Sequence, residues 1–161
     1  MSAKTPVTPA VRFLRQKKVA YAERLYDYVE HGGTGESARQ LGVDEHCVVK
    51  TLVIEDDGRK PLIVLMHGDR SVSLKNLARQ LGAKAMKLCE PDVAKKHTGY
   101  LFGGTSPFGT LKPLPVYYEK TILELPIMLI NCGKRGFLVE MAPADVVRIL
   151  DAKPVDVGIA D

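Results

Sequence analysis

The sequence contains no tryptophan, and aromatic residues make up only 6% of its 161 positions. It has no apolar run approaching the ~18 residues of a membrane-spanning helix, and its first ten residues lack the apolar core of a secretory signal. The three cysteines, Cys47, Cys89 and Cys132, are far apart and include no CxxC pair. These absences argue against a disulfide framework and a zinc site. We expect a cytoplasmic protein with reduced cysteines and no membrane partner.

Common catalytic signatures are also missing. The chain has no GxSxG elbow, no GxxxxGK[ST] phosphate loop, no HExxH and no spaced carboxylate pair. Its four histidines, at positions 31, 46, 67 and 97, show no ligand spacing. We therefore expect neither a metal nor a cofactor.

The composition that is present indicates one globular domain. Hydrophobic residues make up 45% of the chain and charged residues 26%, which is ordinary for a soluble protein. No internal repeat, low-complexity tract or linker divides residues 1–161, so we predict a single domain. The 23 basic and 19 acidic residues give a net charge of +4, which permits a polyanionic partner without requiring one.

Helix and strand signals alternate irregularly along the chain. Thr8 is a good N-cap for a first helix, and the DDGR tetrad at Asp56–Arg59 predicts an antiparallel hairpin. We predict helices at 9–17, 36–41, 74–81, 90–97 and 143–150, and strands at 19–28, 48–55, 61–66, 85–88, 115–118, 126–131 and 137–141. This pattern predicts a mixed α/β fold, with a mixed sheet or partly closed barrel surrounded by helices.

Lys50 is the most unusual residue of the predicted strands. It lies in the run CVVKTLVI and shares a strand face with Val48, Leu52 and Ile54, while the opposite face is also apolar. An ammonium group there needs a route to water, a bound anion or a lowered pKa. Two interpretations follow from the strand alone: an edge lysine that prevents aggregation, or a pocket lysine that meets an anionic or carbonyl substrate.

Two glycine-rich segments are candidates for a binding site. The stretch Thr98–Pro115 includes GGTSPFG and is too apolar for a solvated loop, so we expect it to pack inward; a second turn reads GKRG, at Gly133–Gly136. Glycines allow backbone N–H groups to approach a phosphate or a developing oxyanion. Ordinary tight turns would also explain either segment.

The order of these motifs resembles the YbaK/EbsC family of aminoacyl-tRNA deacylases, which is related to the editing domain of bacterial prolyl-tRNA synthetases. The resemblance covers nearly the whole chain. It rests on TPAVxxL near the N-terminus, Tyr26, VVKTLV around Lys50, LKNLARQLGAK, TGYLFGGTSPFG, GKRG and a closing ILDAK.

The resemblance implies hydrolysis of a wrongly attached small amino acid from the 3′ end of a tRNA, most often proline tRNA, with prolyl-tRNA synthetase as a partner. It implies no protein nucleophile: cysteinyl substrates would use their own thiol, and alanyl substrates water. Lys50 matches the family's essential lysine and would stabilise charge. The expected substrate-binding residues are Tyr26, Thr51, Tyr100, Gly103, Gly104, Ser106, Asn131 and Gly133.

The chain departs from the family pattern at the expected amino-acid pocket. Asn131 and Cys132 replace SG before the second turn, Tyr28 replaces a histidine, and the glycines around Gly33 stand where an aromatic residue is usual. Cysteine is the expected amino acid, with alanine or another small residue next. The alternatives are a non-catalytic module that binds a tRNA end or a nucleotide, and a subunit that only scaffolds a synthetase.

Overall fold

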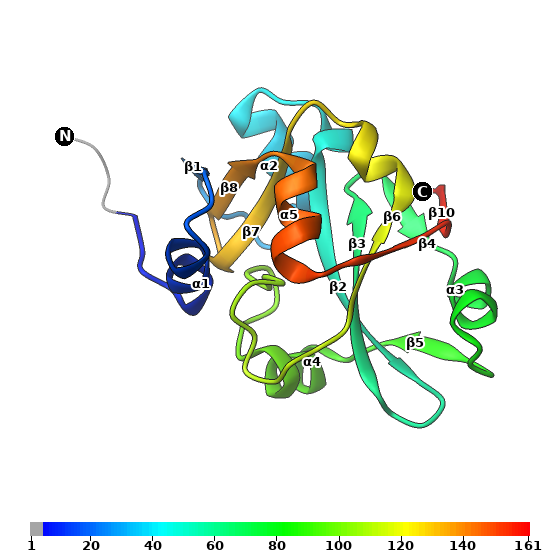
Figure 1. Cartoon of the computed structure of the whole chain (residues 1–161). Helices are drawn as coiled ribbons and strands as arrows, with labels where there is room; N and C mark the ends of the chain where they lie inside the picture. The colour runs from blue at the N-terminus through cyan, green and yellow to red at the C-terminus, as the bar shows by residue number, and fades with distance from the viewer. Residues whose placement is uncertain (1–4) are drawn as a thin grey trace.

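The computed structural model describes residues 5–161 (Figure 1). Its elements in chain order are α1 Pro9–Lys17, β1 Ala22–Leu25, α2 Gly33–Leu41, the short 3-10 helix η1 Glu45–Cys47, β2 Val48–Asp56, β3 Pro61–His67, β4 Arg70–Val72, α3 Leu74–Leu81, β5 Met86–Leu88, α4 Pro91–Thr98, β6 Val116–Glu119, η2 Lys120–Glu124, β7 Met128–Lys134, β8 Phe137–Met141, α5 Pro143–Leu150, β9 Lys153–Val155 and β10 Gly158–Ala160. Within this part of the chain, no helix is long and apolar enough to cross a membrane.

An eight-stranded mixed sheet forms the centre of the molecule. Seven strands lie in the order β1-β8-β7-β2-β3-β6-β9, and β5 pairs with the far end of β2. The hairpin β2–β3 is antiparallel as predicted, whereas β2 pairs with β7 and β3 with β6 in parallel. The fold class is confirmed as a mixed α/β sheet; the sheet is open rather than barrel-like, because β1 and β9 remain at opposite edges.

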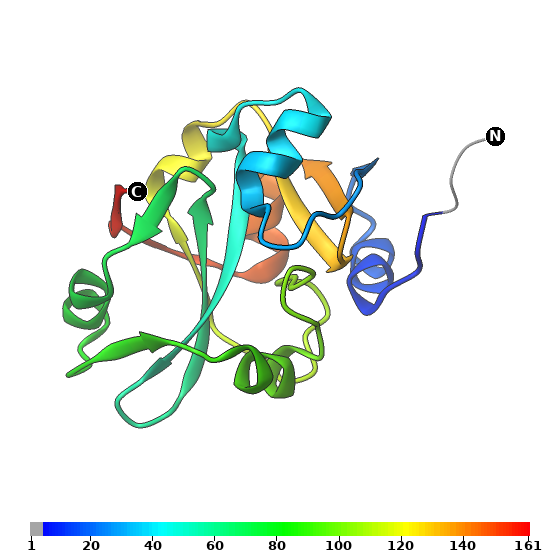
Figure 2. The same cartoon turned by 180° about the vertical axis from the view of Figure 1, so that it is seen from behind.

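Helices cover both faces of this sheet. The largest core cluster combines α1 and α5 with Val49 and Val53 of β2. On the other face, Ala38 of α2 packs near Val48, and Leu77 of α3 packs near Ile54. Figure 1 views the sheet from the side of α5, and Figure 2 from the side of α2. The structure thus confirms the prediction that β2 residues alternate between two apolar faces.

Several element boundaries differ from the sequence prediction. β1 is shorter because Lys18 ends α1 in the left-handed conformation and Val19 remains packed in the core below the helix. α2 begins at Gly33 because Thr34 bonds to Glu45 and to the carbonyl of Gly68. Both differences depend on tertiary contacts that local patterns do not encode.

Five short elements were not predicted: η1, β4, η2, β9 and β10. β4 and β10 form a separate two-stranded sheet in which Arg70 pairs with Ala160. β9 is held at the sheet edge by β6. These strands are three residues long, too short for a period-two pattern to identify them.

The segment Thr98–Pro115 packs inward only in part. Tyr100 and Phe108 are buried, but Leu101 is 54% exposed and Phe102 is 62% exposed. The Tyr100 hydroxyl donates a hydrogen bond to the Phe108 carbonyl at 2.6 Å, which closes the segment on itself. The expected inward packing thus holds for Tyr100 and Phe108, whereas Leu101 and Phe102 remain exposed.

Candidate active site

The site begins with a gap in the pairing of β2. Val48 and Val49 pair with β7, and the end of β2 from Ile54 pairs with β5. Cys89 N–H donates to the carbonyl of Val53 at 2.9 Å, which continues that second pairing. Between them, residues 50–52 are paired only with β3. β2 lies between β7 and β3 in the sheet, so the interpretation of Lys50 as an edge-strand residue is wrong. At Lys50 itself, however, β2 has a paired neighbour on one side only.

A cavity of about 400 Å³ lies against this open stretch. Figure 2 shows the segment after α4, in yellow-green, on this side of β2. The lining comes from the chain after β1, the start of α2, β2, the Thr98–Pro115 segment, and β7 and β8. The residues are Tyr26, Tyr28, Val29, His31, Gly33, Thr34, Glu36, Ser37, Val48, Val49, Lys50, Thr51, Leu52, Phe102, Gly103, Thr105, Asn131 and Leu138.

Lys50 is partly buried between two apolar clusters of its sheet face. Its ammonium group donates a hydrogen bond to the backbone carbonyl of Arg70, at the start of β4. A lysine ammonium carries three N–H donors, so this bond leaves donors available for a ligand. The chain therefore places an oriented positive charge at a mostly apolar cavity wall.

The two glycine turns highlighted by the sequence touch each other. A Cβ atom on Gly104 would lie 2.9 Å from the backbone nitrogen of Arg135, so only glycine permits this approach. Arg135 Nε also donates to the carbonyl of Phe102 at 2.8 Å, and its guanidinium lies 5.0 Å from the centre of the Tyr28 ring. The GKRG turn thus holds the pocket loop in place.

Gly103 is fixed by two residues that depart from the family pattern. Asn131 Nδ2 donates to the Gly103 carbonyl at 3.1 Å, and Asn131 Oδ1 accepts from Gly133 N–H at 2.8 Å. Gly103 has a φ of +88°, and a Cβ atom there would lie 2.9 Å from the Tyr28 hydroxyl oxygen. Asn131 and Tyr28 therefore restrain the same point of the loop.

The structure brings five of the predicted site residues together. Lys50, Tyr26, Thr51, Gly103 and Asn131 all line the cavity. The Thr51 hydroxyl oxygen is buried and has no hydrogen-bond partner among residues 5–161. Buried hydroxyls are normally satisfied, so this unpaired oxygen is an exception in the structure.

The other four predicted residues lie outside the cavity lining. Tyr100 and Ser106 are buried, and the Ser106 hydroxyl accepts from Phe108 N–H at 3.2 Å. The N–H of Gly104 donates to Leu101, and that of Gly133 donates to Asn131. Tyr100 and Ser106 therefore shape the loop from within the core, and the two glycine amides are already engaged.

Burial and neighbouring charge shift the pKa of two lining residues. Burial raises the pKa of Tyr26, opposed by a hydrogen bond from the backbone of Gly136. Hydrogen bonds from Arg39 and then Gln40 lower the pKa of Glu36, which keeps this carboxylate ionised. Lys50 is thus not the only charged residue at the cavity, because Glu36 of α2, which is paired with Arg39, also lines it.

Some lining residues carried no signal in the sequence. Val29, Thr105 and Leu138 become neighbours only through the pairing of β1, β8 and β7 and the course of the loop. Arg70 was missed because it contributes a backbone carbonyl, which no side-chain pattern reports. The pocket could be anticipated around Lys50 and Gly103, but not its full wall.

A second hollow of about 440 Å³ lies on the other side of Tyr26. Its lining includes Lys134 and Arg135 from the β7–β8 turn, together with Gln40 and Asp27. Among residues 5–161, Tyr26 is the one residue that lines both hollows. No residue of β2 lines this hollow, so we assign the chemistry to the Lys50 cavity.

One group of side chains in the described structure has a composition suited to a metal ion, namely Glu55, Cys89 and His97. None of the three lines the Lys50 cavity.

Comparison with known proteins identifies the family. The profile described as an aminoacyl-tRNA editing domain matches residues 32–149. The chain belongs to this family. It is 30% identical to EbsC of Enterococcus faecalis, a proposed Cys-tRNA(Pro)/Cys-tRNA(Cys) deacylase, over 91% of the chain and 90% of that protein.

Two further proteins are similar to the chain. It is 29% identical to the proline–tRNA ligase of Moorella thermoacetica, over 73% of the chain but only 21% of the ligase. It superposes with a TM-score of 0.81 on the crystal structure of a proposed trans-editing enzyme for prolyl-tRNA synthetase. That alignment covers 96% of the chain and all of the other protein at 21% identity, and it supports the fold.

Proposed function

We propose that this chain is a trans-acting editing hydrolase that removes a wrongly attached small amino acid from tRNA. The first substrate we propose is Cys-tRNA(Pro), followed by Ala-tRNA(Pro) or another small aminoacyl group. The observation that carries the proposal is the Lys50 ammonium in a cavity of about 400 Å³ beside the Gly103 loop. Family membership supports the same reaction class.

The reaction breaks the ester bond between the amino-acid carbonyl carbon and a ribose oxygen of the terminal adenosine. Negative charge then develops on the carbonyl oxygen and on the ribose oxygen that leaves. The N–H of Gly103 has no partner among residues 5–161, whereas the amides of Gly104 and Gly133 are engaged. Gly103 N–H is therefore the amide best suited to the carbonyl oxygen, and Lys50 to the leaving oxygen or a neighbouring phosphate.

The cavity supports a mechanism without a protein nucleophile. No cysteine of the described chain lines the cavity. Among the lining hydroxyls of residues 5–161, only that of Thr34 donates a hydrogen bond to a carboxylate, that of Glu45, at 2.7 Å. This bond and the nearby Gly68 carbonyl hold Thr34 at the start of α2. With a cysteinyl substrate, the substrate thiol would attack its own carbonyl: the S–C bond forms, the ester C–O bond breaks, and the thiol proton goes to the ribose oxygen. With alanine, water would take that place.

Charge and aromatic surface around the cavity suit a tRNA end. Lys134 and Arg135 line the adjoining hollow, where they can meet backbone phosphates. Phe102 is 62% exposed at the cavity rim, and Tyr26 lies between the two hollows, so both rings are available to stack on the terminal adenine. We further propose that selectivity for proline tRNA comes in part from prolyl-tRNA synthetase.

A deacylation panel tests the proposal. The purified full chain is incubated with proline tRNA charged with cysteine, alanine, serine or proline, with and without prolyl-tRNA synthetase. We expect release of cysteine first, alanine or serine more slowly, and no release of proline. If the chain increased the rate of cysteine release by less than about tenfold over spontaneous hydrolysis, the enzyme assignment would be contradicted.

The same panel separates the enzyme from a non-catalytic module. A module that only binds a tRNA end would retain affinity for an adenosine carrying a non-hydrolysable cysteinyl group but release no amino acid. Such a module was expected if the departures near Gly33 and Asn131 closed the pocket. They line an open cavity instead, so the structure favours the enzyme over the module.

A further inference from the structure

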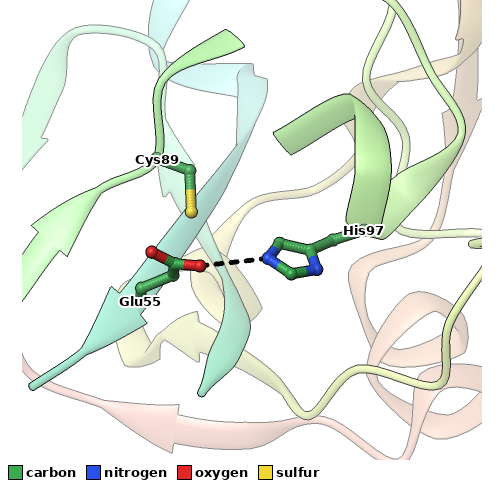
Figure 3. A group of neighbouring side chains, drawn as sticks. All are labelled: Glu55, Cys89 and His97. Carbon is green, nitrogen blue, oxygen red and sulfur yellow. Dashed lines mark hydrogen bonds and ion pairs between the residues drawn. The ribbon is translucent and has the colours of Figure 1, made fainter. Parts of the chain in front are cut away.

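Three side chains with different donor atoms converge at the far end of β2. Glu55 comes from β2, Cys89 follows β5, and His97 lies in the last turn of α4. One oxygen, one sulfur and one nitrogen atom of these residues all lie within 4.8 Å of one another. Figure 3 shows the three side chains pointing toward a common centre from three separate segments. Because these residues are distant in the sequence, a search for closely spaced ligands does not find them.

The group is sheltered from solvent. The side chains of Glu55 and His97 are each 12% exposed, and Cys89 is half-buried. Burial, followed by the nearby carboxylate of Glu55, raises the pKa of the Cys89 thiol to about 11. In the metal-free protein the thiol is therefore protonated at neutral pH.

Hydrogen bonding accounts for two of the three residues but not for the third. His97 Nε2 lies 3.1 Å from Glu55 Oε2, and the Lys112 ammonium lies 3.2 Å from His97 Nδ1. A neutral His97 that donates to Glu55 and accepts from Lys112 satisfies this chain. The Cys89 side chain packs against the largest core cluster and makes no hydrogen bond within residues 5–161, so the Glu–His bond does not involve its sulfur.

We propose that Glu55, Cys89 and His97 form a binding site for a divalent transition metal ion, with Zn²⁺ as the best match. Zn²⁺ takes thiolate, imidazole and carboxylate ligands at about 2.0–2.3 Å, and a tetrahedron with these bond lengths has ligand atoms roughly 3.3–3.6 Å apart. Closing the observed group to that size requires movements of about 1 Å. Mg²⁺ and Ca²⁺ are poor matches because they require oxygen ligands.

Binding requires two changes of protonation. The metal–sulfur bond forms as the Cys89 S–H bond breaks, and that proton passes to solvent. His97 would bind through Nε2, so its ring proton moves to Nδ1 and the contact with Lys112 is lost. Lys112 is exposed and can turn away into solvent. The fourth metal position is left for a water molecule, since three protein ligands are present.

The site would brace the loop that forms the Lys50 cavity. α4 ends at Thr98 and leads directly into the segment that carries Phe102 and Gly103. A metal at Glu55, Cys89 and His97 would join this helix to β2 and to the chain after β5. Metal binding at this site does not depend on the proposed editing activity.

Cobalt titration tests the site, because a thiolate bound to Co²⁺ produces a charge-transfer absorption and tetrahedral Co²⁺ gives visible bands. The chelator-treated full chain is titrated with Co²⁺ and then with Zn²⁺. We expect one equivalent of each to bind, with Zn²⁺ displacing Co²⁺ and raising the Tm. Cys89→Ser should remove the charge-transfer band, and His97→Gln and Glu55→Gln should weaken binding by at least about tenfold.

Two further variants make the result decisive. Cys47→Ser, which changes a half-buried cysteine outside the group, should retain the band. Lys112→Met should bind the metal more tightly than the unchanged chain, because the competing ammonium is removed. Absence of a thiolate–Co²⁺ band in the unchanged chain, or its survival in Cys89→Ser, would overturn the proposal and leave the group as a hydrogen-bonded latch.

Discussion

Gly103 combines three constraints that few residues of the chain share. Its φ is +88°, its carbonyl accepts a hydrogen bond from Asn131, and the Tyr28 hydroxyl occupies the space of a Cβ atom. Because two of these partners depart from the family pattern, the departures have a local explanation: they restrain the loop in another way. They do not leave the cavity without support.

Gly103→Ala should therefore impair activity more than stability. A methyl group would meet the Tyr28 oxygen at 2.9 Å and force the left-handed conformation on an alanine, which costs about 1–3 kcal/mol. We expect kcat/KM for Cys-tRNA(Pro) deacylation to fall about 10- to 100-fold. Adding Tyr28→Phe should restore part of this loss because it removes the clashing oxygen.

The matched control is Gly58→Ala in the β2–β3 turn, where a Cβ atom would meet only Asp56 Oδ1 at 3.3 Å. It should leave kcat/KM unchanged. Equal activity of Gly103→Ala and the unchanged chain would show that this loop position does not serve the reaction.

At the scale of elements, a buried polar network joins the unpredicted segments to the sheet. His67, at the end of β3, lies 2.8 Å from the His46 carbonyl and 2.7 Å from the Thr121 hydroxyl oxygen in η2. Glu119 Oε1 accepts hydrogen bonds from the N–H groups of Val157 and Gly158, just before and within β10. Since β10 pairs with β4, this network supports the strand that presents the Arg70 carbonyl to Lys50.

The network predicts a pH dependence of stability through His67. Burial lowers the pKa of His67 below its ordinary value of 6.5, although a hydrogen bond to His46 partly opposes this. Below pH 6.5 the unfolded chain takes up a proton that the folded chain does not, so the free energy of unfolding falls as the pH decreases from 6.5. One such group contributes at most about 1.4 kcal/mol per pH unit.

Urea unfolding of the unchanged chain and of His67→Gln between pH 7.5 and about pH 5 measures this contribution. The variant should be less stable at pH 7.5 but should lose less stability on acidification. His31→Gln serves as the control, because the side chain of His31 is 86% exposed. Equal acid dependence of His67→Gln and the unchanged chain would rule out His67 as the source.

At the scale of the whole molecule, the sequence predicted the long elements and the fold class. α1, β2, β3, α3, β8 and α5 follow their caps, turns and apolar periods closely. The interior position of β2 and the gap beside Lys50 could not be predicted, because they depend on which distant strands pair. A buried strand has the same local pattern whether it is central or at an edge.

The candidate site, like the fold, was predictable from the sequence only in part. Lys50 could be recognised because an ammonium group among valines and leucines is costly to bury, and Gly103 could be recognised by its glycine-rich setting. The ring of Tyr100 lies in the core and not in the cavity lining, and an aromatic residue in a loop gives no sign in the sequence of which way its ring turns. The Glu55, Cys89 and His97 group was invisible because its members meet only after folding.

Single-turnover deacylation of Cys-tRNA(Pro) by Lys50→Met tests whether the positive charge of Lys50 drives the proposed reaction. Methionine keeps much of the side-chain volume and removes the charge, so the fold should persist while the rate falls at least about 100-fold. Lys60→Met, in the β2–β3 turn, is the matched control and should keep the full rate. A folded Lys50→Met chain that deacylates as fast as the unchanged protein would contradict the account.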